Sequence, residues 1–319
     1  MATLAEELQR PKSSLDDFRE ICERLLNYMA DVTAYIRITK IFSAFLILFP
    51  IQLVGKDVLF TIQYRQAQPS DSEQFVIITE QQTWHPNQTA IIICDMWDQH
   101  WCRGATDRVA ELAPAINAFI SAGRNKGILI IHAPSSVVNY YRDHPARKNA
   151  RAAPKAENIP KNMADWCHSI EGEDVNLWPI DQSDGGCDCS PACEQGSPWR
   201  KQIETIEIKK NDIISDSGIE VWNVFEERGI QNVILVGVHT NMCVIGRPFG
   251  LRNMKRVGKN VVLCRDLTDT MYNSRKKPFV SHFEGTELII EYIEKYICPT
   301  ISSTDLRHEP AFQFKDDRK

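Results

Sequence analysis

Residues 232–244 read NVILVGVHTNMCV, an apolar run that leads directly into a polar segment containing Cys243. Continuous apolar runs of this length are typical of strands buried on both faces of a parallel sheet. Runs of the same kind occur at 89–94 (TAIIIC), 127–133 (GILIIHA), 203–210 (IETIEIKK) and 259–266 (KNVVLCRD). Helical periodicity separates them at 106–126, 217–228 and 285–297. The alternation predicts an α/β fold: a three-layer α/β/α sandwich with a mostly parallel, doubly wound sheet.

The alternation of strand and helix patterns also predicts where the main domain begins and ends. We expect it to span 58–300, with one or two extended segments over 58–79 and a Cys-rich insertion over 134–200 that interrupts the alternation. Residues 1–57 form an N-terminal extension, and 301–319 a polar C-terminal tail.

Composition excludes some partners. The 319 residues are 43% hydrophobic with a net charge of −5, which is ordinary for a globular protein and gives no basic surface for nucleic acid. The expected partner is a small-molecule substrate.

Residues 41–54 (IFSAFLILFPIQLV) complicate the cellular location. The run is short for a bilayer-spanning helix, which needs about 20 apolar residues, and it resembles the apolar core of a signal peptide. We therefore expect a working start at Met29 or a signal anchor, with any membrane contact limited to this segment. Secreted or membrane-anchored location is favoured over cytoplasmic, and the alternative is an apolar helix buried against the domain.

In parallel sheets, functional sites lie at the carboxyl ends of the strands. Asp95 follows the first parallel strand, Lys209 and Lys210 end the run at 203–210, and Cys243 follows NVILVGV. A thiol needs a nearby cation or a helix N-terminus to ionise, and a carboxylate can accept its proton. These residue types at one edge of the sheet predict a cysteine hydrolase.

The segments IIICDMWDQHWC and VILVGVHTNMCV resemble the two motifs of the isochorismatase-like, nicotinamidase-related cysteine hydrolases. The resemblance covers about 89–299 apart from the insertion. It implies that fold, a catalytic triad of Asp95, a lysine and Cys243, a cis peptide between Val238 and His239, and an oxyanion hole formed by the backbone N–H groups of His239 and Cys243.

The sequence departs from the family around its lysine. The stretch KKNDIISDSG lacks the usual Ser-Ala-Phe-like anchor; counting back from the next helix favours Lys210, and Lys209 is the alternative. The nicotinamidase metal cluster is absent, so no metal or cofactor is predicted.

Further polar residues lie near the same edge. Substrate contact and structural packing are both open for Asp98, His100, Trp101, His132, Thr240 and Asn241. Arg247, one helical turn after Cys243, is expected to form an ion pair with Asp266 or Asp269, and binding a carboxylate of the substrate is the alternative.

The insertion carries Cys187, Cys189 and Cys193, with Cys167 upstream. Disulfides are favoured, and free thiols or a zinc site are the alternatives. Trp166, Trp178 and Trp199 of the insertion are expected to cover the pocket.

These features favour hydrolysis of an amide or related C–N bond through a Cys243 acyl-enzyme. The alternative, suggested by the altered lysine segment, is a catalytically silent binding or scaffold protein. The resemblance also implies a homo-oligomer.

Overall fold

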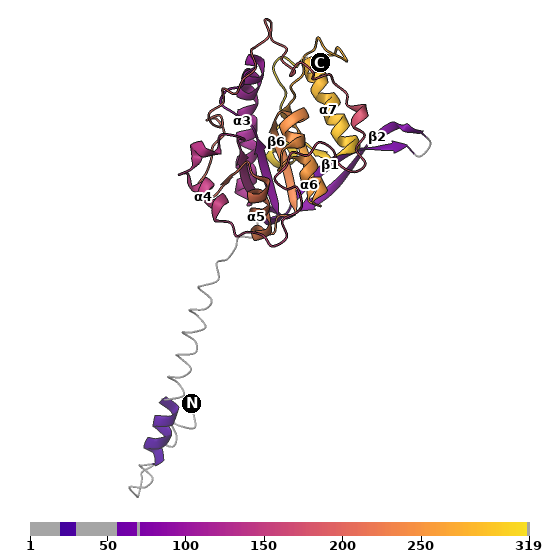
Figure 1. Cartoon of the computed structure of the whole chain (residues 1–319). Coiled ribbons are helices and arrows are strands. Elements are labelled where there is room, and N and C mark those ends of the chain that lie inside the picture. The colour runs from indigo at the N-terminus through magenta and orange to yellow at the C-terminus, as the bar shows by residue number, and fades with distance from the viewer. Residues whose placement is uncertain (1–19, 30–55, 69–70, 318–319) are drawn as a thin grey trace. The chain divides into compact units, whose positions relative to one another are not determined.

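The computed structural model describes residues 20–29, 56–68 and 71–317 (Figure 1). The chain divides into two units, Met1–Val54 and Gly55–Lys319. In the first unit residues 20–29 are helical. The apolar segment 41–54 lies outside the described residues, and none of the described helices is long and apolar enough to cross a bilayer.

The second unit is built on one eight-stranded sheet with the order β2-β1-β8-β7-β6-β3-β4-β5. The strands from β8 to β5 along this order pair in parallel, and β1 is antiparallel to both β2 and β8. The bounds are β1 Val58–Gln68, β2 Asp71–Trp84, β3 Thr89–Cys94, β4 Leu129–Ala133, β5 Ile213–Ile214, β6 Asn232–Val238, β7 Asn260–Asp269 and β8 Thr300–Ile301.

Helices cover both faces of the sheet (Figure 1). One apolar core lies between the sheet and helices α3 and α8, and a second lies between the sheet and helices α5, α6 and α7. The helix bounds are α3 Arg103–Lys126, α4 Pro145–Ala152, α5 Gly218–Arg228, α6 Leu251–Arg256, α7 His282–Tyr296 and α8 Thr304–Arg307. The predicted three-layer, mostly parallel α/β fold is therefore confirmed.

Short-range signals explain the helix ends. Gly229 ends α5 in the left-handed conformation, as a residue without Cβ does at low cost. Ser281 and Glu284 form a capping box at the start of α7, in which each side chain binds the other residue's backbone N–H. Pro114 lies inside α3 without ending it.

The strand predicted over 203–210 is wrong. This segment is irregular, and the parallel strand is Ile213–Ile214, which pairs with β4. Ile203 and Ile206 pack into the same core as α3 while the residues between them are polar. The resulting alternation of apolar and polar residues in IETIEIKK resembles the pattern of a strand.

The C-terminal segment also differs from the predicted polar tail. Ile301 belongs to β8, Leu306 of α8 is buried, and Phe314 packs into the core below α3. These apolar residues are too widely spaced in the sequence to show a period.

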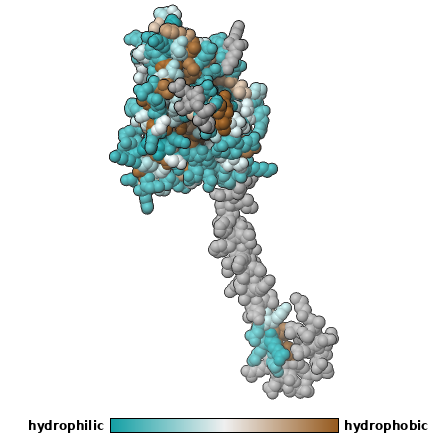
Figure 2. Space-filling view, turned by 90° about the vertical axis from the view of Figure 1, so that its right-hand side faces the viewer, coloured by the Kyte–Doolittle hydropathy of each residue, from teal (hydrophilic) through white to brown (hydrophobic). Residues whose placement is uncertain are grey.

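The insertion runs over the carboxyl end of the sheet largely without regular structure, apart from α4 and two 3₁₀ turns at Val138–Tyr141 and Val175–Leu177. On the side of the molecule seen in Figure 2, hydrophilic residues cover most of the domain and hydrophobic patches lie among them.

Candidate active site

A tight turn after β6 positions Cys243. The Val238–His239 peptide is cis, and Thr240–Val244 form a single π-helical turn. Gly237 has φ +103, and a Cβ there would lie 2.2 Å from the carbonyl oxygen of Cys94. Only glycine therefore lets the end of β6 approach β3 this closely, which brings the Cys243 turn beside Asp95.

Asp95 is the buried acid of the site. Its side chain is fully buried and its φ is +47, a conformation that Asp and Asn tolerate better than most residues. The backbone N–H of Ser135 donates to Oδ1 at 2.8 Å. Oδ2 has no hydrogen-bond partner among the described residues. This oxygen is free to accept a proton or a hydrogen bond from a group in the site.

Arg247 supplies the positive charge. Its Nε lies 3.4 Å from Asp95 Oδ2, and its guanidinium packs over the ring of Trp166. Although burial opposes it, Asp95 and then Cys243 raise the pKa of Arg247. The expectation that Arg247 pairs with Asp266 or Asp269 is wrong, because Asp269 binds Arg108 and His282, and Asp266 binds Ser303.

The Cys243 thiol, the Asp95 carboxylate and the Arg247 guanidinium change one another's pKa. Burial, followed by the Asp95 carboxylate, raises the pKa of the Cys243 thiol, and Arg247 lowers it. Burial also raises the pKa of Asp95, against the effect of the Arg247 charge and of the neighbouring Cys243 thiol. In the resting site the proton therefore stays on the sulfur, and the acid beside it is its natural acceptor.

The structure does not bring either predicted lysine to this site. Lys209 and Lys210 precede β5, so they lie at the edge where the parallel strands begin, opposite Cys243. Lys209 pairs with Glu207, and both lysines are exposed. The backbone N–H of Lys209 binds Asp212, which also binds Arg124 near the end of α3. The assignment failed because it placed the end of a strand at Lys210.

Four of the proposed contact residues have structural partners. Asp98 accepts hydrogen bonds from the backbone of Arg200 and Lys201, and buried Thr240 bonds the hydroxyl of Thr268. His132 is buried between Gln202 and Asp212, and the Asn241 amide bonds Gln182 and the backbone of Met271.

The remaining two proposed contact residues, His100 and Trp101, lie in an aromatic group beside the Cys243 turn. His100 stacks on Trp97 and Trp199, and its ring centroid lies 4.9 Å from that of His239. Burial lowers the pKa of His100 to about 4, so this ring is neutral at pH 7. Trp101 packs on His100. Trp199, which belongs to the insertion, thus packs against Trp97 and His100 in this group.

A pocket of about 290 Å³ adjoins the nucleophile turn through Asn241 and Met242. Trp166 and Trp178 of the insertion line its other side. The Trp166 indole lies against Gly246, where a Cβ would come within 2.3 Å of the ring. A pocket of about 550 Å³ lies elsewhere, lined by residues that include Arg65, Phe283 and Phe312, and neither Asp95, Cys243 nor Arg247 lines it.

The residue that sequence reasoning undervalued is Arg247. Its spacing of four from Cys243 was visible, and its backbone N–H bonds the carbonyl of Cys243 at 3.0 Å. The sequence could not show that Asp95, more than 150 positions earlier, would be its partner.

Comparison with known proteins assigns the family. The sequence model of the isochorismatase domain matches residues 89–284, more than half of the chain. A comparison with curated proteins found no match. Among solved structures, the chain is similar to a cysteine hydrolase from Pseudomonas syringae pv. phaseolicola 1448A, with 17% sequence identity and a TM-score of 0.44. The match covers 70% of this chain and 93% of that one.

Two further structures are an N-carbamoylsarcosine amidase from Thermoplasma acidophilum and a nicotinamidase from Bacillus subtilis. The first is 11% identical and covers 57% of this chain and 83% of its own; the second is 16% identical and covers 65% and 94%. Both have TM-scores of 0.32, so family membership rests on the sequence match. With its sequence matched over residues 89–284, the chain belongs to the isochorismatase family of hydrolases.

Proposed function

We propose that this protein is a cysteine hydrolase that cleaves an amide or related C–N bond of a small molecule through an acyl-enzyme on Cys243. The observation that carries the proposal is the state of Asp95. A fully buried carboxylate keeps one oxygen without a hydrogen-bond partner among the described residues, and that oxygen faces a thiol and a guanidinium. An arrangement so costly for stability is typical of a catalytic site.

The chemistry follows from the positions of these groups. Cys243 Sγ attacks the substrate carbonyl carbon while its proton passes to Asp95 Oδ2. The tetrahedral intermediate then collapses, the C–N bond breaks, and the leaving nitrogen takes the proton from Asp95. Water then attacks the thioester while Asp95 accepts one of its protons. The C–S bond breaks, the carboxylic acid product leaves, and the proton returns from Asp95 to the Cys243 sulfur.

The backbone N–H groups of His239 and Cys243 are the proposed oxyanion donors. Both belong to the turn that carries the nucleophile, so a carbonyl oxygen beside Sγ would lie near them. We assign the cationic role of the family's lysine to Arg247. It holds Asp95 ionised before attack and lowers the pKa of Cys243.

The test is hydrolysis of a panel of small amides and ureides by wild type, Cys243→Ala and Asp95→Asn. Asn is preferred to Ala at position 95 because it tolerates φ +47 and retains an oxygen for the Ser135 N–H. We expect turnover by wild type alone, with a covalent acyl adduct on Cys243 seen by mass spectrometry after acid quench. Hydrolysis that persists in Cys243→Ala would overturn the mechanism.

A catalytically silent binding protein is the second candidate, because no lysine lies beside Asp95 in the described part of the chain. It predicts that wild type binds small amides, measured by calorimetry, yet forms no adduct and turns none over. Slow alkylation of Cys243 would not favour this candidate, since the raised pKa of the thiol makes it slow in an enzyme as well.

A further inference from the structure

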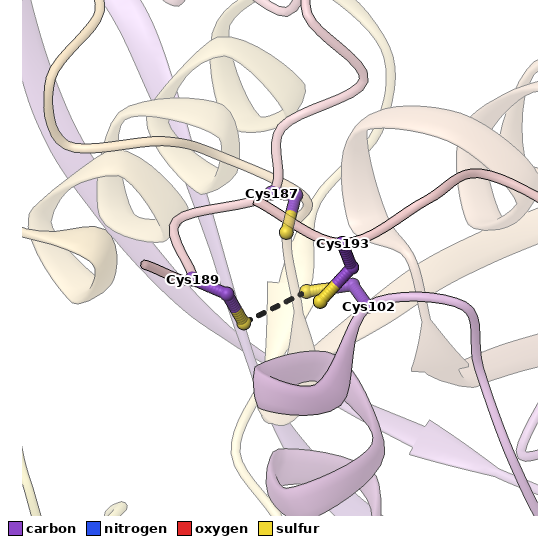
Figure 3. A group of neighbouring side chains, drawn as sticks. All are labelled: Cys102, Cys187, Cys189 and Cys193. Carbon is purple, nitrogen blue, oxygen red and sulfur yellow. Dashed lines mark hydrogen bonds between the residues drawn. The ribbon is translucent and has the colours of Figure 1, made fainter. Parts of the chain in front are cut away.

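Four cysteine side chains converge at a place that the hydrolase chemistry does not use (Figure 3). Cys102 immediately precedes α3, and Cys187, Cys189 and Cys193 come from the insertion. Their four sulfur atoms all lie within 4.8 Å of one another. The chain thus closes a loop of more than eighty residues to place four soft ligand atoms together.

The fourth member of this cluster is not the one that the sequence suggested. Cys167 donates its S–H to the carbonyl of Ser169 and takes no part. Cys102 was overlooked because it belongs to the Asp95 motif, 85 positions before Cys187. With Cys102 included, the unpaired C-x-C-x₃-C spacing of the insertion is completed by a ligand from a rigid helix end.

The distances fit a metal better than a disulfide. Cys102 Sγ and Cys189 Sγ are 3.8 Å apart, and all described cysteines are free. A disulfide requires sulfur atoms about 2.05 Å apart. A tetrahedral ion with Zn–S bonds of about 2.3 Å places its sulfurs about 3.8 Å from one another.

Two of the four sulfur atoms accept hydrogen bonds from the backbone of α3. The backbone N–H of Gly104 donates to Cys189 Sγ at 3.3 Å, and that of Arg103 donates to Cys193 Sγ at 3.5 Å. Both N–H groups belong to the first turn of a 24-residue helix, whose N-terminus stabilises negative charge. These bonds leave each sulfur free to bind a metal on its other side.

Arginines surround the cluster. Arg275 binds the carbonyl oxygens of Asp188 and Cys189, Arg103 binds that of Pro191, and Arg108 lies 3.8 Å from the Asp188 carboxylate. Four thiolates around a divalent ion leave a net charge of −2, which Arg103 and Arg275 would offset, whereas Arg108 is already paired with Asp269.

We propose that Cys102, Cys187, Cys189 and Cys193 bind one zinc ion as a closed tetrathiolate site. Binding forms four Zn–S bonds and releases the four thiol protons to solvent, with no change of oxidation state. All four coordination positions are filled by protein, so the role is structural. The ion would fasten the insertion, which carries the pocket-lining residues Trp166 and Trp178, to the segment that connects Asp95 with α3.

Partial exposure gives the metal a path to the site, because Cys189 and Cys193 are half-buried whereas Cys102 and Cys187 are buried. The proposal is independent of the hydrolase chemistry, since Cys243 is not a ligand and no catalytic step involves the ion.

The experiment measures metal bound to the full chain, reduced under anaerobic conditions and titrated with zinc against a chromophoric chelator. We expect one equivalent of zinc per chain. The same protein loaded with cobalt(II) should show the visible ligand-field bands of a tetrahedral site and strong thiolate-to-cobalt absorption in the near ultraviolet. Failure of the reduced wild type to retain zinc would overturn the proposal, as would a cobalt spectrum without thiolate ligation.

Variants assign the ligands. Cys189→Ser should bind zinc at least tenfold more weakly, whereas Cys189→His should restore binding with a cobalt spectrum shifted by the nitrogen ligand. Cys167→Ser is the matched control, because this cysteine lies in the same insertion outside the cluster and should leave the stoichiometry at one. Equal loss in Cys167→Ser and Cys189→Ser would count against the site.

Discussion

Two buried aspartates at opposite edges of the same sheet have opposite environments. Asp212, 3% exposed, lies before β5 and receives hydrogen bonds from Arg124, His132 and the backbone of Lys209. Burial opposes its ionisation, but these partners hold the pKa of Asp212 below its ordinary value. Asp95 is fully buried at the other edge, one of its oxygens has no hydrogen-bond partner among the described residues, and burial raises its pKa.

The difference separates a structural carboxylate from a reactive one. A carboxylate whose oxygens are all bound stabilises the native state and has no capacity left for a proton. A carboxylate with a free oxygen beside a thiol costs stability and can take that thiol's proton. Each aspartate also has its own arginine, Arg124 or Arg247, so substitutions at the two edges can be matched.

The largest contrast should appear in turnover. Cys243→Ala at the carboxyl edge should lower kcat/KM by at least about 1,000-fold, because it removes the attacking atom. Lys210→Ala at the opposite edge should change kcat/KM by less than about twofold, as an exposed residue distant from the site does. Steady-state kinetics on any substrate found in the panel decides the point, and a large loss in Lys210→Ala would restore the lysine triad.

The free energy of unfolding should depend on Asp212 and not on Asp95, the reverse of the expected effect on turnover. Asp212→Asn should lower the free energy of unfolding by about 3 kcal/mol, because it leaves a largely buried Arg124 and His132 without their carboxylate. Asp95→Asn should not lower it, since the ionised Asp95 side chain is itself unfavourable in the fold. Urea denaturation at pH 7 measures both.

The pH dependence gives a second measurement for the same pair. The pKa of Asp212 is lower in the folded state, so its stabilisation is complete above its unfolded pKa of about 3.9 and is lost as the pH falls below that value. The stability gap between wild type and Asp212→Asn should therefore close in acid. A gap that stays constant down to pH 3 would contradict the assignment.

The two arginines sharpen the comparison further. Arg247→Ala should lower kcat/KM by on the order of 100-fold, through loss of the charge that acts on Asp95 and Cys243. Arg124→Ala removes the corresponding partner of Asp212 and should reduce stability with kcat/KM almost unchanged. If both variants lose activity in proportion to stability, Arg247 is structural.

The smallest effect concerns thiol reactivity. The Asp95 carboxylate is the second cause, after burial, of the raised pKa of Cys243. Asp95→Asn should therefore lower that pKa and speed iodoacetamide alkylation of Cys243 at pH 8 by on the order of tenfold, although it abolishes hydrolysis. Arg247→Ala should slow alkylation, and peptide mass spectrometry assigns the modified residue. Alkylation rates equal to wild type in both variants would show that the three groups are not coupled.

The sequence was sufficient for the elements with strong local signals. The apolar runs of β3, β4, β6 and β7 and the periodicity of α3, α5 and α7 are properties of consecutive residues, and buried parallel strands and amphipathic helices require them. Asp95 and Cys243 could be placed at one edge for the same reason, because each directly follows such a strand.

Only the tertiary structure decided the partners. β5 has two residues, too few for a pattern, so the sequence placed a lysine at the wrong end of the sheet. Arg247 pairs with Asp95, and the Cys102 sulfur lies beside three thiols of the insertion. In both cases more than eighty positions of sequence separate the partners. Such pairings depend on how the turn at Gly237 and the insertion pack. Long-range contacts of this kind leave no period in the sequence, because ion pairs and thiol clusters need a distance in space and no fixed spacing along the chain.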